Sequence, residues 1–352
     1  MCNGSIMDKL ISFALPLMLS GILQLMFNAV DIIVVGHFSS SQALAAVGST
    51  TALINVFVNL FIGVSLGTNV LAARCYAAGK DKEMSEVVHT SILFALISGI
   101  VMAVIGVLLA KPALQLMQTP EDVIDQSALY MRIYFLGMPF FMLYNYGAAV
   151  LRAVGDTKRP LMYLILSGIV NTLLNLFLVI VFRLAVAGVA ISTIIAQCIS
   201  CILILNCLRK SESSYKLTFS GLSIKWVYLR QIFQVGIPAG IQSMVINFSN
   251  ALLQSSVNSF GSTAMAGYTA ANNILGFLYA SVNAVTQACM SFTSQNFGVG
   301  KYKRVDLVLR DCMILTVGVS LVLGGGAYLF GNEVLRIYTN DSEVVRLSLI
   351  HI

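Results

Sequence analysis

Long uncharged apolar stretches recur along this chain, and they constrain its fold more than any other feature of the sequence. A helix needs about 20 apolar residues to cross the hydrocarbon core of a bilayer. A tenth such stretch begins near 344, and nine complete ones lie at residues 10–35, 44–73, 87–110, 127–151, 160–182, 185–208, 232–258, 264–295 and 305–330. Backbone groups in lipid must be hydrogen-bonded within a segment, and these runs are too long for barrel strands. The sequence therefore predicts an all-α polytopic membrane protein.

The composition and charge support a membrane protein. Only 10% of the 352 residues are charged, where soluble domains carry roughly 25%, so a soluble globular protein is excluded. The seven cysteines are scattered through apolar runs, which indicates interior filler rather than a disulfide framework. The net charge of +6 comes from basic residues in short gaps between apolar runs, a pattern typical of membrane orientation. We expect no nucleic-acid partner.

Basic residues also predict the orientation. Sixteen of the 21 lysines and arginines fall in one set of alternate loops, and the opposite set holds only Lys111, Arg132, Arg183, Arg336 and Arg346. Lys and Arg are enriched in cytoplasmic loops. The sequence thus predicts a multi-pass protein of the plasma (inner) membrane whose N-terminus is cytoplasmic.

The chain contains an internal sequence repeat. Residues 77–82 match residues 298–303, and residues 114–123 match residues 335–344 at the same offset. Each copy spans six helices, an even number, so the two copies enter the membrane in the same orientation, as parallel repeats. Bundles of this kind are typical of secondary transporters, with the substrate path between the repeats.

The repeat predicts the domain organisation. We expect an N-lobe at 1–208 with spans one to six, a cytoplasmic linker at 209–231, and an incomplete C-lobe at 232–352 with spans seven to nine and the start of span ten. Two copies of the repeat need about 442 residues, so the chain is expected to be truncated at its C-terminus. Motifs of ATP-driven transport and of common membrane hydrolases are missing from the sequence, which favours a transporter over an enzyme.

Asp31 is the outlier among the 15 acidic residues, because the others fall in loops, at the N-terminus or at helix ends. A charge at the centre of a membrane helix costs about 2.5 to 3.5 kcal/mol, so such a residue usually faces a cavity or an ion path. Burial favours the protonated form, which a proton gradient could titrate. The alternative is that Asp31 lies near the outer interface, close to His37, and reaches water. It shares one stripe of its helix with Gln24, Phe27 and Asn28.

Two further pairs of polar residues lie within predicted spans at i, i+4 spacing. Asn171 and Asn175 share a face of span five, and Thr193 and Gln197 share a face of span six. Their oxygens suit a hard monovalent cation or a protonated carboxyl group. The alternative is that they tie membrane helices together, at about 0.6 kcal/mol for each hydrogen bond.

Other residues suggest a substrate pocket and bends. Tyr144 and Asn145 in span four place polar groups beside aromatic rings and methionines, which suits amphipathic molecules, although such residues also serve as core filler. Pro16 and Pro139 predict kinks in spans one and four. His89 falls near the end of a span, where we expect water to reach it.

On these motifs the chain resembles the multidrug and toxic compound extrusion (MATE) family. The resemblance covers the whole chain and is carried by Asp31 and its stripe, Gly67-Thr68 with Gly79-Lys80, residues 151–160, Asn171 to Asn175, and residues 295–300. The family has twelve helices in two pseudo-symmetric six-helix lobes and exchanges cytoplasmic, often cationic drugs for H⁺ or Na⁺. The resemblance implies a cation-coupling site of Asp31, Asn171, Asn175 and Thr193, a drug cavity lined by Gln24, and a hinge at Pro16. Many members carry an aspartate where this chain has Asn175, so this site has one carboxylate.

We therefore expect a secondary active multidrug efflux antiporter. Its partners would be small-molecule drugs or toxins and the lipid bilayer, its coupling ion H⁺ or Na⁺ with no other cofactor or metal, and its oligomeric state a monomer. Candidate substrate contacts are Gln24, Phe27, Asn28, Tyr144 and Asn145. One alternative is a lipid-linked saccharide flippase of the same superfamily, which would need cationic residues that the span interiors almost lack. Another is a non-transporting membrane protein.

Overall fold

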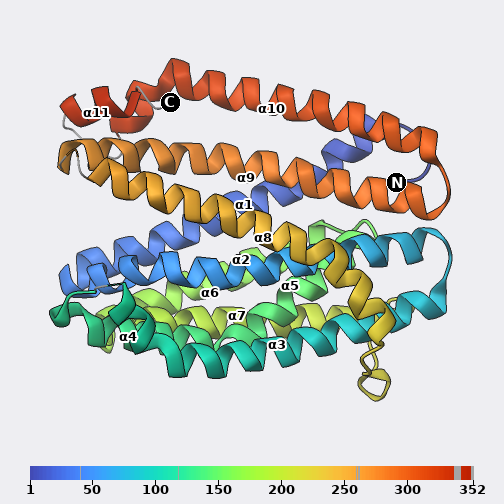
Figure 1. The fold of residues 1–352 in the computed structure, drawn as a ribbon, viewed down its shortest axis with the longest axis horizontal. Coiled ribbons are helices and arrows are strands. Elements are labelled where there is room, and N and C mark those ends of the chain that lie inside the picture. Colours follow the sequence, from blue (N-terminus) through green and yellow to red (C-terminus); the bar gives the residue numbers. More distant parts are fainter. Residues whose placement is uncertain (40, 118, 259, 261, 337–341, 350–352) are drawn as a thin grey trace.

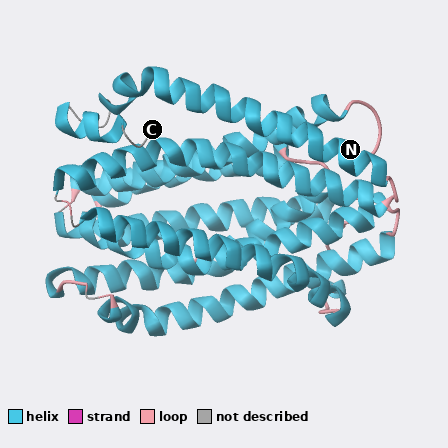
Figure 2. Ribbon diagram, turned by 45° about the horizontal axis from the view of Figure 1, so that its top comes forward, coloured by secondary structure: helices cyan, strands magenta, loops and turns pink. Residues whose placement is uncertain are grey.

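The computed structural model describes residues 1–352 apart from 40, 118, 259, 261, 337–341 and 350–352, together with the side chains of all but some residues in α2, α8, α9 and α11. The helices are α1 (Ile6–Phe38), α2 (Ser41–Ala77), α3 (Asp81–Leu116), α4 (Glu121–Leu136), α5 (Met138–Ala153), α6 (Lys158–Leu176), α7 (Ala185–Lys210), α8 (Trp226–Asn258), α9 (Ser262–Gly298), α10 (Tyr302–Arg336) and α11 (Ser342–Leu349). A π-helical turn at Phe177–Val181 extends α6. The described residues form helices and loops without strands (Figure 2).

These helices run side by side along the longest axis of the molecule (Figure 1). Within the described residues, seven are long and apolar enough to cross a membrane, or eight if the α4 and α5 pair is one span. Helix α8 is equally long but falls outside that set, because glutamines and asparagines such as Gln234, Gln242 and Asn247 lower its hydropathy. The prediction of an all-α polytopic membrane protein is confirmed.

The predicted span at 127–151 is a bent pair of helices. Helices α4 and α5 meet at Gly137 with a bend of 46°. Pro139 follows in the first turn of α5, where its missing N–H leaves no helical hydrogen bond unmade. A proline in this position starts a new helix more readily than it continues the preceding one. The bend shows that the predicted kink is present.

The helices of the two repeats have matching bounds. Helices α2 and α9 both begin and end at the offset that separates the repeated sequence blocks. Helices α3 and α10, and likewise α4 and α11, begin at the same offset. The helical pattern of the first repeat therefore recurs in the second, as parallel repeats require.

Helices α1 and α8 cross between the two repeats (Figure 1). We call the end of the bundle that carries the N-terminus and loops 78–80, 154–157, 211–225 and 299–301 the basic end. Near it, α1 packs through Leu10 and Phe13 onto Ala288 and Phe292 of α9. At its other end, α1 joins the large N-lobe core through Val35. Helix α8 belongs to the second repeat, but Ile232 near its start is buried in the N-lobe core.

Close contacts join the two repeats in the half of the bundle nearest the basic end. A Cβ atom at Gly67 of α2 would overlap the carbonyl oxygen of Ile232 in α8. Asn69 accepts a hydrogen bond of 2.9 Å from the Ser291 hydroxyl of α9. Gln295 of α9 donates a hydrogen bond of 2.6 Å to the Ala153 carbonyl at the end of α5. This half of the interface is closed.

His89 was expected in water, and that expectation is wrong. Its side chain is 5% exposed because the α7–α8 loop folds over it. The Thr218 backbone N–H donates to Nε2 at 3.1 Å, so Nε2 is an acceptor and Nδ1 donates to the Ser85 carbonyl at 2.7 Å. Next to it, the Thr90 hydroxyl donates to the Ser223 carbonyl at 3.2 Å. The linker is thus held on α3 over part of its length.

Candidate functional site

The candidate site lies where α1 runs alongside α6. Both helices start at the basic end, so they are parallel and successive turns of one meet successive turns of the other. The ring of Phe27 occupies the space that a side chain at Gly168 would need. One turn further along α1, Asp31 meets Asn175, which follows Gly168 by two turns on the same face of α6. The absence of a Cβ at Gly168 therefore permits the approach that brings Asp31 to α6.

Asn175 donates a hydrogen bond from Nδ2 to Oδ1 of Asp31 at 2.6 Å. Asn175 is fully buried, and Asp31 is half-buried. Hydrogen bonds to ionised groups are about twice as strong as neutral ones. The amide thereby offsets part of the cost of placing a carboxylate inside the bundle.

Buried oxygen atoms surround this pair. Asn171 donates to the Thr193 hydroxyl of α7 at 3.4 Å, and that hydroxyl donates to the Val189 carbonyl at 2.9 Å. The Oδ1 atoms of Asn171 and Asn175 are buried and find no donor among the described residues. A buried acceptor without a partner costs about 1 to 3 kcal/mol, which a bound cation or a proton donor would remove. The site thus combines one carboxylate with neutral oxygens, the donor set of a hard cation.

The other residues predicted from the sequence lie in different surroundings. Gln24 and Asn28 are exposed, so the predicted stripe on α1 splits into a packed side with Phe27 and an open side. The Tyr144 hydroxyl donates to the Pro160 carbonyl at 3.0 Å and ties α5 to the start of α6. The Asn145 amide donates to the Phe141 carbonyl of its own helix at 2.8 Å. Described hydrogen bonds join neither residue to Asp31.

Pro16 lies in the half of α1 that packs on the second repeat. It is buried inside the helix, and its missing N–H removes one backbone hydrogen bond there. The Ser20 hydroxyl donates to the Pro16 carbonyl at 2.8 Å. Pro16 therefore weakens the backbone of α1 within its contact with α9, because that contact continues to Leu17 and Gly21.

Sequence reasoning missed a second buried carboxylate. Asp311 in α10 is 7% exposed and pairs with Arg310 at 3.0 Å. The sequence contains a pattern that could have identified it, because Val308, Asp311 and Cys312 share one helix face at i, i+3, i+4 spacing. All three residues are buried. It lies on a different helix from the α1–α6–α7 site.

The sequence of this chain is similar to those of known proteins. The MatE family model matches residues 16–177 and 238–351, which include Asp31, Asn171 and Asn175. The chain belongs to the MatE family. It is 30% identical over 345 residues to the probable multidrug resistance protein YoeA of Bacillus subtilis, covering 96% of this chain and 74% of the relative. It is 22% identical over 353 residues to the multidrug export protein MepA of Staphylococcus aureus, covering 98% and 76%.

Solved MATE structures share the fold. The outward-facing conformation of a multidrug resistance MATE family transporter of the MOP superfamily aligns with a TM-score of 0.90 at 20% identity, over 99% of this chain and 78% of the other. MATE in the bent conformation aligns with a TM-score of 0.89 at 20% identity, over 98% and 78%. The two-lobe helical fold expected for this MatE family member is therefore confirmed.

Proposed function

We propose that this chain is a secondary active multidrug efflux antiporter that exchanges amphipathic, often cationic drugs for H⁺ or Na⁺ and leaves the drug chemically unchanged. Membership of the MatE family supports transport. Relatives named for multidrug resistance and multidrug export support drugs as the substrates. The bond from Asn175 to Asp31 supports ion coupling.

Coupling would act through the link between α1 and α6. A proton on Asp31 turns an acceptor oxygen into a donor, and Asn175 then has to offer its oxygen instead of its N–H. A Na⁺ ion would instead draw together the Asp31 carboxylate and the unpaired oxygens of Asn171 and Asn175. Either event changes how α1 sits on α6. Because α1 also packs on α9, the change reaches both lobes.

The proposal includes a sidedness and an oligomeric state. The loops of the basic end carry most of the lysines and arginines, so this end and the N-terminus would face the cytoplasm of the inner (plasma) membrane. The substrate path would lie between the two lobes of one chain. A monomer then suffices for transport.

The test is ethidium efflux from membrane vesicles under separately imposed pH and Na⁺ gradients. Asp31→Asn should insert normally and lower ion-driven efflux at least tenfold. The matched control is Asp125→Asn, which alters an exposed carboxylate paired with Lys111 at 2.8 Å and should leave efflux unchanged. The gradient that drives efflux in the wild type identifies the ion. Wild-type efflux by Asp31→Asn under both gradients would exclude Asp31 from coupling.

A further inference from the structure

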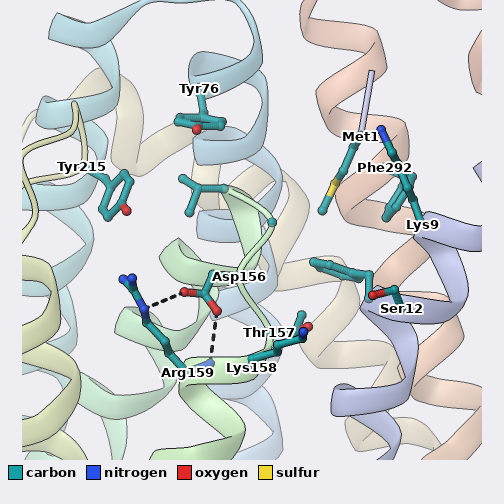
Figure 3. Close-up of a pocket in the computed structure, with 13 residues that line it drawn as sticks. Met1, Lys9, Ser12, Tyr76, Asp156, Thr157, Lys158, Arg159, Tyr215 and Phe292 are labelled. Carbon is teal, nitrogen blue, oxygen red and sulfur yellow. Dashed lines mark hydrogen bonds and ion pairs between the residues drawn. The ribbon is translucent and has the colours of Figure 1, made fainter. Parts of the chain in front are cut away.

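A pocket of about 520 Å³ opens at the basic end (Figure 3). It lies between the first turns of α1 and loop 154–157, with Tyr76 of α2, Tyr215 of the linker and Phe292 of α9 in its walls. Ser12, which lines it, precedes Asp31 by 19 residues of one helix, roughly 28 Å at 1.5 Å per residue. The pocket is therefore separate from the candidate cation site.

The charges in this pocket favour an anion. Lys9, Lys158 and Arg159 line it, against one carboxylate, Asp156. That carboxylate is already engaged, because Arg159 Nε lies 3.2 Å from Oδ2 and the Arg159 backbone N–H donates to Oδ1 at 3.1 Å (Figure 3). The pocket keeps an excess of two positive charges, which attracts anions and repels cationic drugs.

The hydrogen-bonding groups point to the same class of ligand. Besides the three cations, the pocket presents the hydroxyls of Ser12 and Thr157 and the phenols of Tyr76 and Tyr215. The part of the chain that the structure describes supplies no partner for these four hydroxyls. A pocket rich in donors, whose one carboxylate is taken, suits a ligand rich in acceptors, and a phosphate group offers several charged acceptor oxygens.

Aromatic rings wall the pocket on two sides. Phe13 and Phe292 pack edge to face with centroids 5.6 Å apart, and Tyr76 and Tyr215 do so at 6.5 Å. Such surfaces accept an apolar group beside the anion. The volume of 520 Å³ falls within the range of about 300 to 1,000 Å³ typical of small-molecule pockets.

We propose that an organic phosphate binds in this pocket and bridges the two repeats at the basic end. Lys9 and Ser12 lie on the half of α1 that packs against α9, whereas Thr157 and Lys158 begin α6 in the N-lobe. One phosphate held by both pairs joins the two sides of the pocket. The bound ligand therefore stabilises the closed arrangement of this end. The phosphate can come from a membrane phospholipid or from a soluble organic phosphate.

The test measures binding to the purified 352-residue chain in neutral detergent, by isothermal titration and by melting temperature. The probes are dihexanoyl phosphatidic acid, glycerol 3-phosphate, inorganic phosphate and, as the uncharged comparison, dihexanoyl glycerol. Phosphatidic acid should bind and raise the melting temperature, and dihexanoyl glycerol should do neither. Preference for phosphatidic acid over glycerol 3-phosphate assigns the ligand to the lipid, and comparable affinities assign it to a soluble phosphate.

Two double variants decide whether this pocket is responsible. Lys9→Gln with Lys158→Gln should weaken binding of the phosphate probes at least tenfold, and both side chains are exposed, so the fold should persist. Lys82→Gln with Lys225→Gln makes the same change of charge at the same end outside the pocket and should bind like the wild type. Equal loss in both double variants, or no binding of any phosphate probe to the wild type, overturns the proposal. Binding is measured without transport, so the outcome is independent of the efflux proposal.

Discussion

Among the described residues, Asn175 donates the hydrogen bond that the Asp31 carboxylate accepts, at 2.6 Å. Asn175→Leu keeps a side chain of similar volume but removes the donor. Asp31 is half-buried, and an acceptor inside a protein that loses its hydrogen-bond donor costs about 1 to 3 kcal/mol. We expect Asn175→Leu to lower the free energy of unfolding by that amount and to reduce ion-driven efflux, measured by denaturation in detergent and by the vesicle assay.

The matched control is Asn59→Leu, because among the described residues the Asn59 amide donates within its own helix, to the Asn55 carbonyl at 2.7 Å. That variant should unfold nearly as the wild type does. If the two leucine variants prove equally stable and equally active, Asn175 has no special part in holding Asp31.

Sequence spacing predicted which oxygens share a helix face, but not what covers each side chain. The i, i+4 spacing placed Asn171 and Asn175 together, and the structure joins one to Thr193 and the other to Asp31. His89 was misplaced because its cover, the Thr218 backbone, lies 129 residues away in the sequence. Burial of this kind depends on how loops fold back, which local patterns do not encode.

Among the helices, α2 and α8 approach so closely that Gly67 has no room for a methyl group. In Gly67→Ala the new Cβ meets the backbone carbonyl of Ile232, which cannot turn aside as a flexible side chain could. Overpacking of a tight contact costs about 1 to 3 kcal/mol. We expect Gly67→Ala to lower the melting temperature of the purified protein by several degrees.

Gly318→Ala in α10 is the comparison, since a Cβ there meets open space. Alanine favours a helix over glycine by about 0.8 to 1 kcal/mol, so this variant should melt at or above the wild-type temperature. If Gly67→Ala has the same melting temperature as Gly318→Ala, the α2–α8 crossing is looser than its geometry implies.

Hydropathy located the helices but not their full lengths. Helix α2 has 37 residues, although its predicted apolar stretch covers 44–73, because backbone hydrogen bonds continue past the region that lipid requires. The bend before α5 was predictable from Pro139. The pairing of α1 with α9 was not, because apolar faces that pack on protein and on lipid have the same composition.

At the scale of the whole molecule, the Gln295 side chain links the two lobes. It donates a hydrogen bond from α9 to the Ala153 carbonyl at 2.6 Å. Gln295→Ala leaves that buried carbonyl without a partner, at a cost of about 1 to 3 kcal/mol to the closed arrangement. Hydrogen exchange in residues 284–298 should accelerate by about 5- to 150-fold.

Thr286→Ala serves as the control on the same helix, because in the described part of the chain its exposed hydroxyl bonds within that helix, to the Val282 carbonyl at 3.2 Å. Exchange there should be unchanged. An equal acceleration in both variants would mean that α9 loosens by itself and that the lobes do not separate.

The constant offset between matching sequence blocks predicted two parallel repeats, and the helix bounds recur at that offset. It did not predict that α1 and α8 each begin against the opposite repeat. A repeat describes what each half contains, whereas the exchange of the two helices is a property of the assembled pair.

That exchange also sets an order of assembly during synthesis. The faces of Ile6, Leu10 and Phe13 pack on residues between Ala284 and Cys312, which a ribosome adding about 5 to 20 residues per second makes roughly 15 to 60 s later. In that interval α1 has its α6 partner long before its α9 partner. The first repeat can therefore dock Asp31 onto Asn175 early, while the basic half of α1 waits in lipid or against the insertion machinery. Closure of the basic end is a late event, and slowed translation of α9 should prolong the exposure of α1.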